Sequence, residues 1–230
     1  IEKKGDGHHF GDRHSSSVPF LVTVTFFFLV AFWVSCSAFA LDLDRLSDAD
    51  IAMRKQVIEK LEPLIQKRDS ERNLSKLTFD ELYEPLTKEE REFMEKFRKI
   101  RRKDAGVKIP WRGIATGKED LVIIKGQKVK EKIRVKNPDG TRKTVIKTRA
   151  LPPQFLPPNV FEKYEEMMAA MEKDIGKRLY VESGYRSSAF QLYLFVYYLK
   201  NHNYSVRETV KFVALPGYSE HGSVKYQAID

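Results

Sequence analysis

The first strongly hydrophobic stretch of the chain lies near its beginning. Residues 18–34 are apolar except for two threonines. This run is slightly longer than the core of an ordinary signal peptide and slightly short for a membrane span. Ala38-Phe39-Ala40 follows with the small-x-small pattern of a cleavage site. We therefore expect residues 1–40 to be a secretory signal peptide with an N-terminal extension, or a signal anchor held in the membrane by residues 18–34.

Apolar positions after this run recur at helical spacing. Ser47 precedes one such stretch and predicts the start of a helix, which Pro63 is expected to kink or end. Thr78 and Thr87 are each followed three residues later by a glutamate, which is the spacing of a capping box. We interpret residues 41–120 as a helical spacer whose aromatic and methionine side chains form its core.

The pattern then changes to that of strands. Residues 121–124 are a short apolar run, and residues 133–136 and 144–147 alternate between apolar and polar side chains. Between the two alternating runs lies Asn137-Pro138-Asp139-Gly140, a strong turn sequence. We therefore predict a β-hairpin within residues 121–150.

The charge of the chain is concentrated in this hairpin. The net charge is +9, and residues 125–149 contain ten Lys or Arg against only Glu131 and Asp139. One interpretation is a contact with an anionic cell-wall polymer or membrane surface. The other is a solvated face whose lysines keep an edge strand from pairing with other chains. No nucleic acid partner is expected, because no recognition helix, zinc-finger spacing or aromatic RNA-binding motif accompanies the charge.

A proline-rich stretch, residues 151–158, is predicted to be an extended connector that marks a domain boundary. Beyond it the pattern alternates between helix and strand. The expected elements are a helix capped by Asn159 and ending near Gly176, a strand at 178–181, a helix over 188–200, a helix at 206–214 capped by Ser205, and a strand at 227–230. This order predicts the α+β class, with a small mixed α+β domain over residues 151–230 that follows the helical region and the basic β-hairpin.

Two motifs in this last segment carry the candidate chemistry. Ser183-Gly184-Tyr185-Arg186-Ser187 is followed by Gln191, and Pro216-Gly217-Tyr218-Ser219-Glu220-His221 is followed by Ala228-Ile229-Asp230. Together, and in this order, they resemble the VanY-type D-alanyl-D-alanine carboxypeptidases. That family belongs to the zinc peptidases that include the D-Ala-D-Ala dipeptidases and share the fold of the hedgehog signalling domain.

The resemblance implies a role for each matching residue. His221 and Asp230 match the first two Zn²⁺ ligands, and Arg186 matches the catalytic arginine that contacts substrate and steadies the oxyanion. Gln191 and Ser219 match polar positions that line the pocket for the C-terminal end of the peptide. These residue types suit the chemistry, because zinc takes imidazole nitrogen and carboxylate oxygen, and an arginine fork pairs with a carboxylate or an oxyanion.

The sequence departs from the family pattern in two ways. The histidine and aspartate of the family are seven residues apart, whereas His221 and Asp230 are nine apart, so we expect a bulge or a longer loop between them. The third ligand, a histidine, and the general-base glutamate of the family follow the aspartate. By motif, no residue of this sequence fills these two positions, so we expect residues 151–230 to be the N-terminal part of a truncated and inactive domain.

The resemblance favours one function and leaves alternatives open. We expect the full-length protein to be a zinc-dependent D-alanyl-D-alanine carboxypeptidase that trims the terminal D-Ala of peptidoglycan stem peptides or their precursors. The N-terminal segment makes a secreted or periplasmic location the expected one. An L,D-carboxypeptidase or endopeptidase of the same family, and a non-catalytic cell-wall-binding module, remain alternatives.

Overall fold

The structure is a computed structural model that describes residues 41–223, 225 and 227–230. The predicted signal peptide or anchor, residues 1–40, lies outside the described residues. Residues 40–230 group into one compact unit. Within the described ranges, none of the helices combines the length and the apolar character that crossing a membrane requires.

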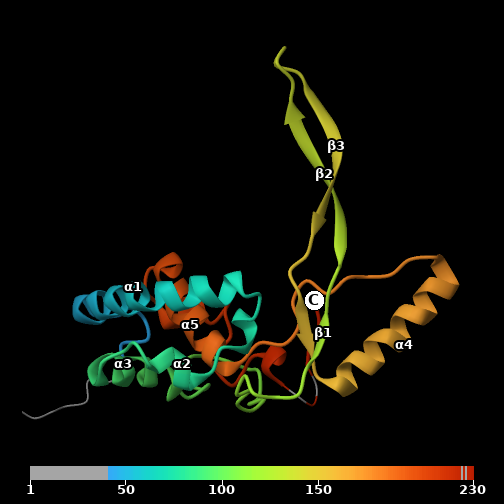
Figure 1. The fold of residues 1–230 in the computed structure, drawn as a ribbon. Coiled ribbons are helices and arrows are strands. Elements are labelled where there is room, and N and C mark those ends of the chain that lie inside the picture. The colour runs from blue at the N-terminus through green and yellow to red at the C-terminus, as the bar shows by residue number, and fades with distance from the viewer. Residues whose placement is uncertain (1–40, 224, 226) are drawn as a thin grey trace, which may run out of the picture. The chain divides into compact units, whose positions relative to one another are not determined.

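The N-terminal helices begin where the capping sequences predict. The side chain of Ser47 accepts a hydrogen bond from the backbone N–H of Asp50, and both predicted capping boxes are formed. The helices of this region are α1 (Asp48–Ser70), the 3₁₀ turn η1 (Leu74–Lys76), α2 (Phe79–Tyr83) and α3 (Lys88–Arg98) (Figure 1).

Pro63 does not end the first helix, which continues to Ser70. The proline ring removes one backbone donor, so the carbonyl of Glu59 loses its usual partner. Both Pro63 and Glu59 are exposed, and water can therefore satisfy that carbonyl. The prediction that Pro63 could end the helix was wrong because it took no account of which helix face meets solvent.

These helices share a hydrophobic core with a later helix, α5 (Ser188–Tyr198). Arg54 of α1 strengthens the contact, because its Nε and Nη2 atoms donate to the carbonyl oxygens of Val196 and Tyr197 at 2.9 and 2.5 Å. These carbonyls lie at the C-terminal end of α5, where intrahelical partners run out. The fully buried residues of this core include Val57, Leu61, Leu77, Leu82, Met94, Leu192, Phe195, Val196, Leu199 and Val206.

The strands form two antiparallel pairs. The predicted hairpin is present as β2 (Lys128–Lys136) and β3 (Arg142–Ala150), with Lys128 opposite Ala150 and Lys136 opposite Arg142. β1 (Val122–Ile124) pairs with β4 (Gln154–Leu156), so the proline-rich stretch holds a short strand as well as extended connector. Helices and small sheets occur together, which confirms the α+β class. The domain boundaries near residues 120 and 150 stay predictions.

Two of the expected helices after this point differ from the structure. α4 (Pro158–Ile175) begins one residue before Asn159, and no side chain caps it, because a proline in the first turn needs no partner for its missing N–H. The helix at Ser205 is short, with α6 covering Val206–Thr209. The 3₁₀ turns η2 (Leu199–His202) and η3 (Glu220–Gly222) complete the helical elements of the described residues.

The expected strands at 178–181 and 227–230 do not form. The backbone N–H and carbonyl of Val181 pair instead with the side-chain amide of Gln127, at 2.7 and 3.1 Å. Asp230 exchanges backbone hydrogen bonds with Ser183. Both segments therefore satisfy their backbone groups without a continuous ladder.

Tyr185 connects the segment before β1 to the arginine motif. Its ring is buried, and its hydroxyl donates to the carboxylate of Glu119 and accepts from the N–H of Gly117 at 2.9 Å. Burial alone raises the pKa of Glu119, but hydrogen bonds from Tyr185 and Thr116 more than offset it and hold that pKa below its usual value. The carboxylate is therefore stabilised in the folded state.

We expect Tyr185→Phe to lower the free energy of unfolding by about 1–3 kcal/mol, because the half-buried Glu119 carboxylate loses a hydrogen bond. The folded-state pKa of Glu119 lies below its unfolded value, so its contribution is present above about pH 4.5 and is lost as the pH falls toward the folded pKa. The variant should therefore lose less stability than the parent between about pH 5 and pH 3. Urea titrations at several pH values measure both effects. Tyr180→Phe, at a half-exposed ring, is the control, and equal losses in the two variants would contradict the assignment.

Candidate active site

The turn that carries the arginine is fixed to the helical region. Ser187 caps α5, with its Oγ accepting from the N–H of Phe190 at 3.2 Å. The same Oγ donates to the carbonyl of Leu77 at 2.6 Å, and the Ser187 N–H donates to the carbonyl of Ser75 at 2.8 Å. The start of α5 is therefore joined to residues far away in the sequence.

Gly184 allows this turn to lie directly against β4. A Cβ atom at this position would lie 2.6 Å from the carbonyl oxygen of Phe155, and the next residue, Tyr185, donates its N–H to that same oxygen at 2.7 Å. The Gly184 N–H donates to the side chain of Gln154 at 3.0 Å. A side chain on Gly184 would force the strand and the turn apart.

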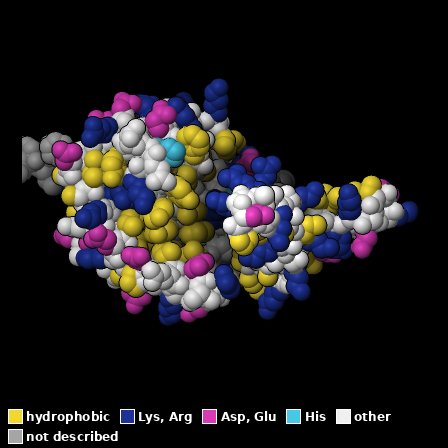
Figure 2. All heavy atoms as spheres, turned by 90° about the horizontal axis from the view of Figure 1, so that it is seen from above, with side chains coloured by type: hydrophobic (Ala, Val, Ile, Leu, Met, Phe, Trp, Pro, Cys, Tyr) yellow, Lys and Arg dark blue, Asp and Glu magenta, His cyan; other side chains and the backbone are white. Residues whose placement is uncertain are grey.

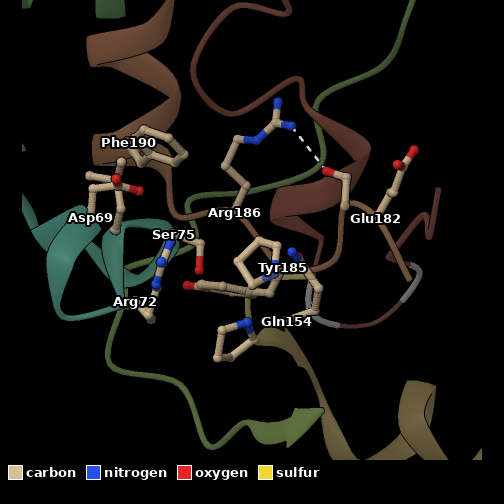
Figure 3. Close-up of a pocket in the computed structure, with 12 residues that line it drawn as sticks. Asp69, Arg72, Ser75, Gln154, Glu182, Tyr185, Arg186 and Phe190 are labelled. Atoms are coloured by element: carbon tan, nitrogen blue, oxygen red, sulfur yellow. Dashed lines mark hydrogen bonds between the residues drawn. The ribbon is translucent and has the colours of Figure 1, made fainter. Parts of the chain in front are cut away.

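Arg186 is held by two polar side chains. Its Nη1 donates to Oε1 of Gln191 at 3.0 Å. Its Nη2 donates to Oγ of Ser183 at 3.2 Å, the bond drawn as a dashed line in Figure 3. Burial lowers the pKa of Arg186 and the charge of Asp230 opposes that shift, but a guanidinium remains charged at any physiological pH. The site therefore contains a permanent cation in a fixed orientation.

The side chain of Gln191 is bonded to Arg186 and does not face solvent. Its Nε2 donates to the carbonyl of Ala214 at 2.6 Å, which turns Oε1 toward Arg186. Its side chain is buried within α5. The structure thus places Gln191 beside the predicted catalytic arginine, where it positions the guanidinium.

The second motif, which ends at His221, is held by contacts with Trp111 and Arg112. Gly217 adopts a left-handed φ of +84°, and a Cβ atom there would lie 2.0 Å from the ring of Trp111. That ring makes an edge contact with Tyr218 at 5.1 Å between centroids. Ser219 is buried, and Glu220 forms an ion pair with Arg112 at 2.7 Å. Glu220 therefore has a structural partner.

His221 and Asp230 lie side by side. The Nε2 atom of His221 is 3.1 Å from Oδ2 of Asp230, although the two residues are nine apart in the sequence. The backbone of Asp230 explains the approach, because its carbonyl accepts from the N–H groups of Glu182 and Ser183 at 2.7 and 3.2 Å. The segment between His221 and Asp230, which is two residues longer than in the family pattern, thus ends against the arginine turn. Residues 224 and 226 of this segment lie outside the residues that the structure describes.

The protonation of His221 suits a metal ligand. Its Nδ1 atom lies 3.1 Å from the carbonyl oxygen of Gly184 and can donate a proton to it. In that tautomer Nε2 carries the lone pair that a metal needs. Burial lowers the pKa of His221, and the charge of Arg186 lowers it further. Asp230 and the Gly184 carbonyl oppose this shift without reversing it, so the surroundings favour the neutral imidazole that binds a metal.

The donor atoms present fit part of a zinc site. Among residues 41–223, 225 and 227–230, no group of three or more His, Cys, Asp or Glu side chains is arranged to hold a metal ion. The pair of His221 and Asp230 supplies two suitable donors. Two ligands at about 2.0–2.1 Å from a tetrahedral zinc lie about 3.3 Å apart, and the observed 3.1 Å is close to that separation.

A cavity of about 230 Å³ lies beside the arginine. Figure 3 shows Asp69, Arg72 and Ser75 on one side of it and Glu182 on the other, with Arg186 above. The first three residues belong to α1 and the turn after it, far from the motifs in sequence. No motif could have identified them, because their position depends on the contacts of η1 with the start of α5.

A second cavity, of about 500 Å³, is also lined by Arg186. Its other walls include Tyr198 and Phe212, and the ring of Phe212 stacks on His202 at 4.6 Å. Neither Gln191 nor Ser219 lines these two cavities. The roles predicted for the site residues stay predictions, but the described structure brings Arg186, His221 and Asp230 into one region.

We expect Gly184→Ala to lower the free energy of unfolding by about 2–3 kcal/mol, because the new methyl group overlaps the Phe155 carbonyl. It should also displace the Gly184 carbonyl, so that the Nδ1 proton of His221 exchanges faster with water in NMR spectra. Gly126→Ala is the control, since a Cβ atom there meets nothing within 4 Å and costs only about 1 kcal/mol of backbone strain. Unchanged His221 exchange in Gly184→Ala would contradict the proposed support.

Comparison with known proteins agrees with the motifs. Residues 153–224 match the family model VanY, described as D-alanyl-D-alanine carboxypeptidase, which is a family of peptidases. No curated protein and no solved structure was found to match the chain. The matched range contains Arg186 and His221, whereas Asp230 and the pocket residues of α1 lie outside it. The predicted resemblance to the VanY-type family is therefore confirmed over residues 153–224, the range that is similar to the family model.

Proposed function

We propose that the full-length protein is a zinc-dependent D-alanyl-D-alanine carboxypeptidase that removes the terminal D-Ala of peptidoglycan stem peptides. The observation that carries the proposal is the placement of His221 and Asp230 with donor atoms 3.1 Å apart, in the same region as a held, charged Arg186. A zinc ion bound by these two ligands and a third would act as a Lewis acid toward water and the scissile carbonyl.

Residues of this chain would bind the substrate and orient the groups that react with it. Arg186 would pair with the terminal carboxylate of the peptide or with the developing oxyanion, since its fork matches both. Gln191 and Ser183 would keep the guanidinium oriented, which avoids the entropy cost of ordering it during the reaction. The Gly184 carbonyl would hold His221 in the tautomer that presents Nε2 to the metal.

The cavity beside Arg186 is the proposed substrate pocket. It is lined by two cations, Arg72 and Arg186, and two acids, Asp69 and Glu182. A stem peptide offers both carboxylates and amines, so a pocket with both signs of charge can pair with several of its groups. We further propose that the protein is secreted or periplasmic. This location is supported by the N-terminal sequence pattern and by the substrate class.

The activity is tested with the full-length gene product, because the family pattern places the third ligand and the general base after Asp230. We expect the zinc-loaded protein to shorten a pentapeptide stem ending in D-Ala-D-Ala by one alanine, as seen by mass spectrometry. Cleavage of a tetrapeptide alone would point to an L,D-carboxypeptidase. Retained cell-wall binding without any hydrolysis would favour the non-catalytic module. Either result would refute the proposal.

The two ligands are tested by substitution. We expect His221→Ala and Asp230→Asn each to lower activity more than about 100-fold, because loss of a ligand exceeds the usual effect of losing an outer-shell partner. Bound zinc after dialysis should fall below one equivalent in both variants. Asp174→Asn, an exposed position in α4, is the matched control for charge. A His221→Ala protein with full zinc content and full activity would overturn the ligand assignment.

A further inference from the structure

The register of the hairpin separates its charges onto two faces. Side chains alternate along a strand, and residues opposite each other in an antiparallel pair share a face. Arg142 lies opposite Lys136 and therefore joins the face of the even-numbered β2 residues. The cations of this face, named here the cationic row, are Lys128, Lys130, Lys132, Arg134, Lys136 and Arg142.

The opposite face has a different character. Val129 is buried there, and Ile133 lies opposite Val145, with both half-buried. The acid of the two strands, Glu131, is also on this face, where it pairs with Arg149 at 2.7 Å. The acid is thus kept away from the cationic row, whose face also carries the exposed Ile146 opposite Lys132.

The cationic row is open to solvent and carries no compensating acid. All six of its residues are exposed, and none forms an ion pair with a carboxylate in the part of the chain that the structure describes. Figure 2 shows Lys and Arg side chains gathered over the hairpin. Neighbouring members of the row are about 7 Å apart along β2, which is within the Debye length of about 8–10 Å. They therefore repel one another.

This repulsion occurs in the β2–β3 hairpin, which has only a small free energy of folding of its own. A two-stranded ribbon without a core is marginally stable in water. Lysines on an edge strand discourage pairing with other chains, but a full row with no acid also carries the cost of this repulsion. A bound anion would relieve the repulsion at several positions together.

We propose that the cationic row binds a linear, base-free polymer of phosphate groups lying along β2. Five of the six cations follow one strand in single file, and β3 adds only Arg142 near the turn. A single file fits an extended polymer, whereas a flat anionic surface would need cations across both strands. Residues 128–150 contain no aromatic side chain, and single-stranded nucleic acids are normally held by stacking on such rings. Lysine pairs with phosphate as a point charge, which suits the four lysines of the row.

The test measures binding of fluorescent inorganic polyphosphate to the full chain at several salt concentrations. With up to six contacts, the logarithm of the association constant should fall with a slope of about −4 against the logarithm of the salt concentration. Lys130→Gln/Lys132→Gln should weaken binding about 10-fold at 0.1 M salt and make the slope shallower by about 1.4. Lys143→Gln/Lys147→Gln removes the same charge from the opposite face of the same hairpin and should change affinity less than about 3-fold.

Further measurements separate the alternatives. Hairpin amide protons should exchange more slowly with polyphosphate present, and circular dichroism checks that both double variants are folded. Equal weakening in the two double variants would mean that only net charge matters and would overturn the assignment to one face. Tighter binding to a thymidine oligonucleotide, or binding to phosphatidylglycerol vesicles but not to polyphosphate, would overturn the choice of partner. This test is independent of peptidase activity.

Discussion

The contact between Gly184 and the Phe155 carbonyl determines how the candidate site is assembled. Because no side chain intervenes, β4 and the arginine turn come within hydrogen-bonding distance, and Tyr185 donates to the same oxygen. The Gly184 carbonyl then faces His221. The backbone of the neighbouring Ser183 exchanges hydrogen bonds with the backbone of Asp230. One short stretch of backbone thus carries the arginine, orients the imidazole and fixes the aspartate.

The helical region preceding the hairpin supports this stretch directly. Ser187 bonds to the carbonyls of Ser75 and Leu77, and Arg54 occupies the C-terminal end of α5. These groups lie more than a hundred residues from their partners in the sequence, so their contribution depends on the shared core. The segment interpreted as a spacer therefore braces α5 at both ends and provides one wall of the pocket.

Local sequence patterns predicted much of the fold because they act over short distances. The capping boxes at Thr78 and Thr87 and the turn at Asn137–Gly140 depend on neighbours three or four residues away, and all three form. The two motifs located the arginine and the histidine for a similar reason, because each motif describes one local turn. The matched family model then covered both.

The remaining features depend on distant partners and could not be predicted. The pairing of β4 with β1 joins segments about thirty residues apart, and Val181 pairs with a glutamine side chain instead of a strand. The resemblance implied that Asp230 lies near His221, but a spacing of nine residues does not reveal the backbone bonds to Ser183 that hold it there. Arg72 belongs to no motif, and only the docking of η1 on α5 brings it to the pocket.

The pairing of β1 with β4 has a consequence for how this chain can vary. The hairpin leaves β1 and returns to β4, which are hydrogen-bonded neighbours, and the Leu151 N–H closes the gap by donating to the Gln127 carbonyl at 2.9 Å (Figure 1). Segments whose ends meet in this way tolerate changes in length, because the flanking backbone keeps its position. The hairpin is thus an insertion within an intact strand pair. Arg149 at its base lies 3.8 Å from Glu182 beside the arginine turn, whereas the length and charge of the part nearer the tip can change independently of that turn.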